Sequence, residues 1–599
     1  MKIKRFTALV AAFLLTAFAA VAQQSVEPSA EKLQQHVGYL ASDALDGRRT
    51  GTAGANDAAR YIAGEFERLG LRPGNAAGPS HKRRAELARY LQTFPYVSGV
   101  NLGPGNALST SNASFQIGND WVPLAYSGNA KVSAGIVFAG FGITAAELNY
   151  DDYAGLNATG KIAIALQGTP DGDNPHGQFA RLHDVRWKTI AARSAGAKAL
   201  IVVARESNFT QDRLTNLTYD NTGGEAGIPV VVISRQSLDK ILSLSNTTLS
   251  DLEKAATAKT PGTIRPLSGE LTLSTDVIRK EVPAYNVVGI LEGSDPVLKN
   301  EAIVIGAHYD HLGRGGDGSL APRAGDIHHG ADDNASGTAG VIELARIFSA
   351  QQSKLKRTLV FIAFSGEEEG LLGSNFYVNH ALMPLAKSVA MINMDMIGRM
   401  KDGKLVIGGV GTAKEWRQII GSGDTFTLTL NEDGYGPSDH SSFYSKQVPV
   451  LFFWTGTHND YHKPSDTFDK INYNDEARIL TMVSRIVRDI DSAGQRLTFT
   501  TAKSDPPRTG GFRVYLGTIP NYADSNDGLL LDGVRDDSPA AKAGLKAGDK
   551  IVKIGNRDVK NVYDYTYALG EMKAGQEYVV EVTRGSEKLT LKITPEARK

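Results

Sequence analysis

The sequence of 599 residues contains no cysteine. Disulfide bonds, thiolate metal sites, iron–sulfur clusters and a cysteine nucleophile are therefore excluded, and any metal site must use His, Asp and Glu. The formal net charge is zero, because 65 Lys and Arg residues balance 65 Asp and Glu residues. This balance argues against a nucleic-acid-binding protein.

Long apolar runs are lacking beyond the N-terminus, so we expect no membrane span in the mature chain. Lys2, Lys4 and Arg5 precede an uncharged apolar stretch at 6–21, which is shorter than the roughly 20 residues that a span requires. The segment Ala20–Ala22 matches the small-x-small pattern of signal peptidase sites. The sequence therefore predicts a cleaved signal peptide at 1–22 and an exported protein, periplasmic or secreted.

The rest of the chain divides into regions of different pattern. Residues 28–95 indicate helices, and the Gly- and Pro-rich residues 75–110 indicate a long surface excursion. Short apolar strands separated by turns predict a compact αβ unit at 130–260. Residues 280–495 alternate apolar strands with helices, a pattern typical of a mostly parallel α/β sheet with helices on both faces.

These patterns predict three domains after the signal peptide. Residues 23–129 and 270–500 are expected to form one α/β domain that is interrupted by an insert at 130–260. A Pro- and Gly-containing linker at 503–511 then leads into a small domain at 512–597.

Four apolar strands of the 280–495 region lead into a His or a carboxylate. They are 302–307 before His308 and Asp310, 358–364 before Glu367 and Glu368, 389–394 before Asp395, and 448–453 before His462. Because the carboxyl ends of parallel strands meet at one edge of a sheet, we expect these side chains to converge. Three carboxylates and two His residues suit two divalent cations that share a bridging carboxylate, with zinc fitting best.

Five motifs in this region resemble the zinc aminopeptidases of the M28 family. They are Gly306–Asp310 (GAHYD), Gly330–Gly337 (GADDNASG), Glu367–Glu368 before Gly370–Ser374 (GLLGS), Asn393–Gly398 (NMDMIG), and Tyr461–His462. The resemblance implies two zinc ions, one bound by His308 and Asp395 and the other by Glu368 and His462.

The same resemblance implies roles for the residues around the metals. Asp332 is expected to bridge both ions, with a cis peptide bond to Asp333. Glu367 is expected to be the general base that activates a metal-bridged water, because a non-ligand Glu beside a ligand can reach it. Asp310 is expected to orient His308 from behind.

Three further side chains are weaker candidates. The Tyr461 hydroxyl either donates to the oxyanion or packs. His440 is expected to line the pocket. Arg399 either binds a substrate carbonyl or carboxylate or forms a structural ion pair.

The flanking domains also resemble known modules. Residues 130–260 are similar to protease-associated domains, through Tyr150–Leu156, Gly160–Ile162, Ala195–Ile201 and Ile228–Ile233, which implies control of access to the site. Residues 512–597 resemble a PDZ domain through Ser538–Leu545 and Gly548–Asp549. The expected partner is a peptide C-terminus, held by the backbone of Tyr515, Leu516 and Gly517.

The sequence lacks a His-Glu-x-x-His motif, a Gly-x-Ser-x-Gly motif and a phosphate-binding loop. The favoured interpretation is an exported di-zinc aminopeptidase that acts on peptides. A carboxypeptidase or dipeptidase on the same scaffold and a non-catalytic, receptor-like protein remain as alternatives. Cleavage only of peptides with a free N-terminus would select the aminopeptidase.

Overall fold

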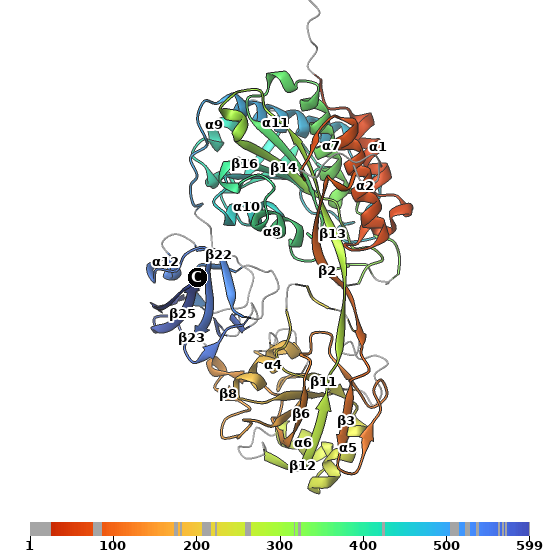
Figure 1. Cartoon of the computed structure of the whole chain (residues 1–599), viewed down its shortest axis with the longest axis vertical. Helices are drawn as coiled ribbons and strands as arrows, with labels where there is room; N and C mark the ends of the chain where they lie inside the picture. The colour runs from red at the N-terminus through yellow and green to blue at the C-terminus, as the bar shows by residue number, and fades with distance from the viewer. Residues whose placement is uncertain are drawn as a thin grey trace, which may run out of the picture.

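A computed structural model gives the structure of the chain. It describes residues 26–597, except for 76–86, 173–177, 180–181, 206–216, 218, 222–223, 258–264, 317, 322–324, 422–425, 503–513, 521–526, 535–537, 561–563, 566–567 and 570–571. The predicted signal peptide at 1–22 lies outside the described residues. None of the helices in the described part is both long and apolar enough to cross a membrane. The chain folds into three domains (Figure 1).

The first domain is built on a mostly parallel sheet, as the sequence predicts. The strand order is β1 (Arg72–Pro73), β13 (Val277–Leu291), β15 (Thr358–Phe364), β14 (Ala302–His308), β16 (Ser388–Met394), β19 (Val450–Trp454), β17 (Lys404–Gly408) and β18 (Thr427–Leu430). Strands β15, β14, β16 and β19 are parallel, whereas β13 and β17 run antiparallel to their neighbours β15 and β19. Every residue of β14, β15 and β16 is buried, as expected for strands that are covered on both faces.

Helices cover both faces of this sheet (Figure 1). One layer contains α1 (Ala30–Leu40), α2 (Ala53–Arg68), α7 (Gly337–Ser349), α9 (Trp416–Ile420) and α11 (Tyr473–Ser492), and the other contains α8 (Leu372–Asn379) and α10 (His440–Ser445). Side-chain caps fix where several helices begin: the hydroxyl of Thr52 accepts from the Ala55 N–H, and Asn472 accepts from the Asp475 N–H.

A long two-stranded ribbon joins the first domain to the second. Strand β2 (Leu91–Leu102) pairs antiparallel with β13 along 277–287, and the two strands cross the space between the domains (Figure 1). The expectation of a surface excursion at 75–110 is therefore wrong for residues 91–102, which form a regular strand.

The inserted domain is larger than predicted. Its sheet has the order β4 (Ser114–Phe115), β3 (Ala107–Thr110), β12 (Arg265–Ser274), β6 (Lys131–Phe138), β9 (Ile162–Leu166), β10 (Ala199–Val203), β11 (Val230–Ile233) and β5 (Trp121–Pro123). Helices α4 (Val185–Ser194), α5 (Arg235–Leu242) and α6 (Leu249–Thr257) and the hairpin of β7 (Thr144–Ala145) and β8 (Tyr150–Asp151) complete it. The predicted limits of 130 and 260 are wrong, because Trp121 and Leu271 are buried in the same core as the central strands.

The C-terminal domain is a small antiparallel sheet. Its strands are β21 (Thr518–Pro520), β22 (Leu529–Val534), β23 (Asp549–Ile554), β24 (Arg557–Asp558), β25 (Tyr578–Arg584) and β26 (Glu587–Ile593), with β20 (Val514–Tyr515) paired to β27 (Glu596–Ala597). Helix α12 (Pro539–Lys542) begins at Ser538, whose hydroxyl accepts from the Ala541 N–H. The loop of Tyr515, Leu516 and Gly517 packs beside this helix, since the Ala540 N–H donates to the Leu516 carbonyl at 2.8 Å. Capture of a carboxylate by this loop stays a prediction.

The C-terminal domain touches both other domains. Strand β22 lies against α10 of the first domain. Asp564 of the C-terminal domain forms an ion pair with Arg193 of α4 in the inserted domain. Arg557 of the C-terminal domain donates to the Ser194 hydroxyl of α4 at 2.6 Å. The Asp564 side chain is 1% exposed, so this contact is well shielded from water.

Candidate metal centre and active site

The strand ends of the first domain bring the predicted polar side chains together. His308 is the last residue of β14 and Asp395 directly follows β16. Glu367 and Glu368 follow β15, and His462 lies in the loop after β19. The turn that precedes α7 adds a further carboxylate. All these side chains lie at the carboxyl ends of the parallel strands, which is where binding sites form in α/β sheets.

One group of donor atoms surrounds the His308 imidazole. Its Nε2 lies 3.3 Å from Oδ1 of Asp395 and 3.4 Å from Oδ1 of Asp333. The other carboxylate oxygen of Asp395 accepts a hydrogen bond from the Ser438 hydroxyl at 2.8 Å. This bond turns Oδ1 of Asp395 towards His308.

A second group surrounds the His462 imidazole. Its Nε2 lies 3.2 Å from Oδ2 of Asp333 and 3.2 Å from Oε2 of Glu368. The two oxygens of Asp333 therefore face different histidines, and this carboxylate joins the two groups.

These spacings fit two zinc ions. Ligands bound tetrahedrally at about 2.05 Å are separated from one another by about 3.3 Å, and the four distances are 3.2–3.4 Å. Each Nε2 faces two carboxylate oxygens, and a single cation placed among these three atoms would bind all of them. The donor set of imidazole nitrogen and carboxylate oxygen also suits zinc.

Backbone carbonyls select the ring nitrogen that faces each group. His462 Nδ1 lies 2.7 Å from the Gly318 carbonyl, and His308 Nδ1 lies 3.2 Å from the Asp310 carbonyl. In a neutral ring, donation at Nδ1 leaves Nε2 unprotonated and available to bind a cation. The Asp310 carboxylate is 3.6 Å from His308 Nδ1 and accepts from the Thr50 hydroxyl at 3.0 Å. Asp310 thus lies behind His308, as predicted, although its carbonyl makes the nearer contact.

The assignment of the bridging carboxylate to Asp332 is contradicted by the structure, which places Asp333 there. The Asp332 carboxylate instead accepts from the Gly398 N–H at 2.7 Å and lies 3.2 Å from His458 Nε2, with no solvent exposure. Asp332 therefore anchors the turn to the loop after β16. The cis peptide bond is likewise one residue later than predicted, between Asp333 and Asn334.

Glycine is required at the start of this turn. Gly330 has a φ of 56°, and a Cβ atom at this position would lie 2.2 Å from the Asp333 carbonyl oxygen. No larger residue fits without moving Asp333.

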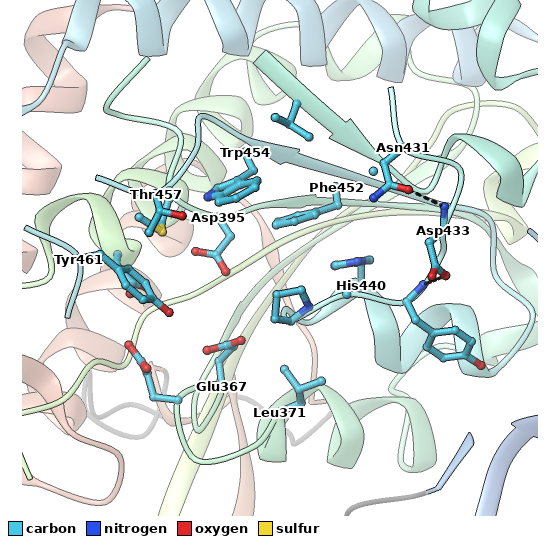
Figure 2. Close-up of a pocket in the computed structure, with 18 of the residues that line it drawn as sticks. Glu367, Leu371, Asp395, Asn431, Asp433, His440, Phe452, Trp454, Thr457 and Tyr461 are labelled. Carbon is cyan, nitrogen blue, oxygen red and sulfur yellow. Dashed lines mark hydrogen bonds between the residues drawn. The ribbon is translucent and has the colours of Figure 1, made fainter. Parts of the chain in front are cut away.

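Glu367 points into a cavity beside these ligands (Figure 2). Its Oε2 is 3.8 Å from His308 Nε2, farther than any of the ligand spacings. Burial, together with the negative charges of Asp395 and Glu368, raises the pKa of Glu367 well above its usual range. A carboxyl group with a raised pKa beside a metal site is suited to taking up and releasing a proton.

The cavity has a volume of about 650 Å³. Glu367, Asp395 and Tyr461 lie around one end of it, and His440, Asn431 and Asp433 lie towards the other (Figure 2). Phe452 and Trp454 form an apolar wall between them. His440 lines the cavity as predicted, with its ring stacked on Phe452 at 4.4 Å.

Tyr461 also lines the cavity, with its ring stacked on His462 at 3.8 Å. Burial and the nearby carboxylates raise the pKa of the Tyr461 hydroxyl. The hydroxyl therefore keeps its proton at neutral pH and can act as a donor.

Arg399 does not reach this cavity. Its guanidinium lies 3.1 Å from Asp460 and 3.8 Å from Asp466, and it is absent from the residues that line the cavity. The hypothesis that Arg399 binds substrate is therefore wrong, and its alternative as a structural ion pair is correct.

His311, for which the sequence predicts no role, touches one of the ligands. His311 is buried, and its Nδ1 lies 2.6 Å from Oε1 of Glu368, while Oε2 of Glu368 faces His462. A separation of 2.6 Å is a hydrogen bond and is shorter than the spacing of two ligands on one metal. His311 therefore positions Glu368 rather than binding a cation itself. The only sequence signal was its place three residues after His308.

Replacing His311 by Leu is expected to weaken zinc binding at the His462 group by about 10- to 100-fold, as is usual when a residue that orients a ligand is lost. His311→Asn should restore most of the affinity, because the Asn amide can donate from nearly the same place as Nδ1. Competition with a chromophoric zinc chelator measures the zinc affinity of both variants. His328→Gln is the matched control, since His328 is also buried but bonds to the Ser319 hydroxyl. Equal affinity of wild type and His311→Leu would contradict this role.

Arg48 is a second residue near the site for which the sequence predicts no role. It is fully buried and donates to the carbonyls of Tyr309 (2.7 Å), Leu40 (2.5 Å), His329 (2.6 Å) and Gly330 (3.0 Å). Burial lowers its pKa to about 10, so it stays charged at neutral pH. One cation thus links the loop after β14 to the turn that carries Asp333.

His440 should make stability depend on pH. Burial lowers its pKa to about 3, against about 6.5 in an unfolded chain. Between these values only the unfolded chain binds the proton, so the free energy of unfolding falls as the pH falls. From pH 6.5 to 4.5 the loss is expected to be about 2 to 3 kcal/mol at 1.36 kcal/mol per pH unit.

His440→Phe should remove this loss, because Phe can stack on Phe452 without titrating. Urea unfolding of both proteins, stripped of metal by a chelator, at pH 6.5 and 4.5 measures the difference. Parallel losses in wild type and variant would show that His440 is protonated in the folded state.

Each of the three domains matches the model of a known family. Residues 286–487 match the model of peptidase family M28, residues 123–241 match the PA domain, and residues 515–594 match the PDZ domain. Aminopeptidase YwaD of Bacillus subtilis is 26% identical over 346 residues, which cover 55% of this chain and 62% of the relative. An aminopeptidase of Pseudomonas aeruginosa is 25% identical over 357 residues, which cover 58% of this chain and 56% of the relative. The chain thus spans less than two thirds of the length of these curated relatives.

Two solved structures also align with the chain. The aminopeptidase from Aneurinibacillus sp. strain AM-1 aligns with a TM-score of 0.45 and 23% identity over 81% of this chain and 98% of that chain. BSAP, a zinc aminopeptidase from Bacillus subtilis, aligns with a TM-score of 0.43 and 22% identity over 78% and 98%. The domain assignment rests on the family matches, which follow the three folded units of the structure. The first domain therefore carries a match to peptidase family M28, the inserted domain a match to the PA domain, and the C-terminal domain a match to the PDZ domain.

Proposed function

We propose that the protein is an exported zinc aminopeptidase that removes the N-terminal residue from peptides. The observation that carries the proposal is the position of Asp333, whose two oxygens lie at zinc-ligand spacing from His308 and His462. The M28 match and the aminopeptidase names of the relatives agree with it. The predicted signal peptide at 1–22 supports export.

His308, Asp395, Asp333, Glu368 and His462 would hold two zinc ions. When bound, such a pair lowers the pKa of water and polarises a carbonyl group. Glu367 would accept the proton of the attacking water and deliver it to the leaving amine. The protonated hydroxyl of Tyr461 would donate to the oxyanion that develops on the substrate.

The charge of the cavity favours an amino terminus over a carboxyl terminus. Among the described residues, its lining includes Glu367, Asp395 and Asp433 but no Lys or Arg. A carboxypeptidase needs a cation for the terminal carboxylate, and Arg399, the one candidate the sequence offered, is held by Asp460 and Asp466. Asp433, which has no proposed role at the metals, instead suits the ammonium group of a free N-terminus.

The PDZ domain supplies a second peptide contact in this proposal. Its expected ligand is a peptide C-terminus, held at the loop of Tyr515, Leu516 and Gly517. The loop lies apart from the metal ligands in the chain, so this binding would be distinct from catalysis.

A panel of peptides with free N-termini and their N-acetylated twins tests the function, with and without a chelator. We expect that only the peptides with a free N-terminus are cleaved, and that they lose one residue at a time from the amino end. The chelator should abolish this activity, and added zinc should restore it. Shortening from the carboxyl end, or equal cleavage of acetylated peptides, would overturn the proposal.

A further inference from the structure

A second cavity lies beside the catalytic one, between α8 and the β2–β13 ribbon. Its volume is about 320 Å³. The residues that give it an apolar and aromatic lining include Phe94, Pro95, Tyr96, Leu372, Phe376 and His380. The zinc ligands, Glu367 and Tyr461 do not line this cavity.

Gly370 joins the two cavities because it lines both. Its N–H donates to the Glu367 carbonyl at 2.9 Å, which closes a tight turn and keeps the two Cα atoms within about 7 Å. On the far side of this turn, Glu369 forms an ion pair with Arg49 at 2.8 Å, next to Tyr96 of the second cavity. The second cavity therefore adjoins the catalytic cavity at the turn that contains Gly370.

Aromatic rings stacked on one another form one wall of the second cavity. Phe376 stacks on His380 with ring centroids 4.1 Å apart and on Phe94 at 5.6 Å. Such stacked rings offer a face that a further aromatic side chain can join. Phe376 itself is only half-buried, so part of its ring is available.

The inserted domain completes the cavity. Asn221 accepts from the Val97 N–H at 3.0 Å and donates to the Val97 carbonyl at 3.1 Å, which binds it to strand β2. Asn221 and Val97 both line the cavity, as does Glu281 of β13. Within the described lining, Glu281 is the sole Asp or Glu residue, so the cavity is far less acidic than the catalytic one.

We infer that this second cavity binds the part of the peptide downstream of the scissile bond, and that it accepts an aromatic side chain at the third or fourth residue of the substrate. This inference rests on the proposed aminopeptidase function. An extended peptide advances about 3.3 Å per residue, so two or three residues carry it from the catalytic site past Gly370. The first residue stays in the larger cavity.

The test is a series of tetrapeptides, Leu-Ala-Ala-Ala with Phe placed at position 2, 3 or 4, compared with leucine p-nitroanilide, which has no downstream residue. For the wild type, Phe at position 3 or 4 should raise kcat/KM about tenfold over Ala, whereas Phe at position 2 should not. Phe376→Ala should abolish this preference and leave the anilide rate within about twofold. Phe426→Ala is the control, since Phe426 is another half-buried aromatic residue of the same domain that lines neither cavity.

A second variant guards against misfolding of Phe376→Ala. Asn379→Trp, at an exposed lining position, should fill the cavity and lower the rate for the aromatic peptides but not for the anilide. Equal losses for peptides and anilide in both variants, or a wild type without preference at positions 3 and 4, would overturn the inference while leaving the aminopeptidase standing. A wild type that cleaves neither peptide nor anilide would overturn both.

Discussion

Replacing Glu367 by Gln is expected to lower kcat by about 10²- to 10⁴-fold, the usual contribution of a general base, while two zinc ions per chain remain. Gln keeps the size of the side chain and its place in the cavity but cannot accept a proton from water. Glu367 is farther from His308 than the ligand carboxylates are, so its charge is not needed to hold the metals. Zinc content by elemental analysis and turnover of leucine p-nitroanilide measure the two effects.

Glu369→Gln is the matched control for this variant. Glu369 stands two residues away but pairs with Arg49 and does not line the catalytic cavity. Its loss should change kcat by less than about tenfold. An unchanged rate in Glu367→Gln with full zinc occupancy would place the base elsewhere.

Replacing Asp333 by Ala is expected to remove both zinc ions. Its two oxygens serve the two histidine groups, so each group loses a ligand at once and keeps two protein ligands. Since bound zinc stabilises the folded state by mass action, the rise in Tm that zinc gives the wild type should disappear in Asp333→Ala.

Asp332→Asn separates this role from that of the neighbouring residue. Asn at position 332 can still accept from the Gly398 N–H, so this variant should keep two zinc ions and a zinc-dependent rise in Tm. If Asp333→Ala binds two zinc ions per chain and Asp332→Asn binds none, the bridging carboxylate is that of Asp332 and not that of Asp333.

The sequence predicted the edge of the sheet where the site lies, but not each side chain. The ends of the strands at 308, 364 and 394 are readable because a buried parallel strand is an apolar run that stops abruptly. Asp332 and Asp333 are identical residues in one turn, and the backbone angles decide which carboxylate faces the histidines. Those angles are irregular, with Asp333 at φ −106° and ψ 92°, so no helix or strand period assigns the direction.

Contacts between distant segments explain the other differences. Strand β2 contains Pro95, Ser98 and Gly99, which favour a loop locally, yet its pairing with β13 forms a regular ribbon. Arg48 resembles any surface arginine in the sequence, and only the fold encloses it with four carbonyls. In both cases the determining partners lie far away along the chain.

The contacts of the PDZ domain close the three domains into a circuit. The ribbon joins the first domain to the PA domain, the pair of Arg193 and Asp564 joins the PA domain to the PDZ domain, and β22 on α10 returns to the first domain. Within such a circuit each contact forms at the high effective concentration that the other two impose. An interface too small to hold separate proteins together is then sufficient. Truncation after residue 502 would open the circuit and remove both contacts of the PDZ domain.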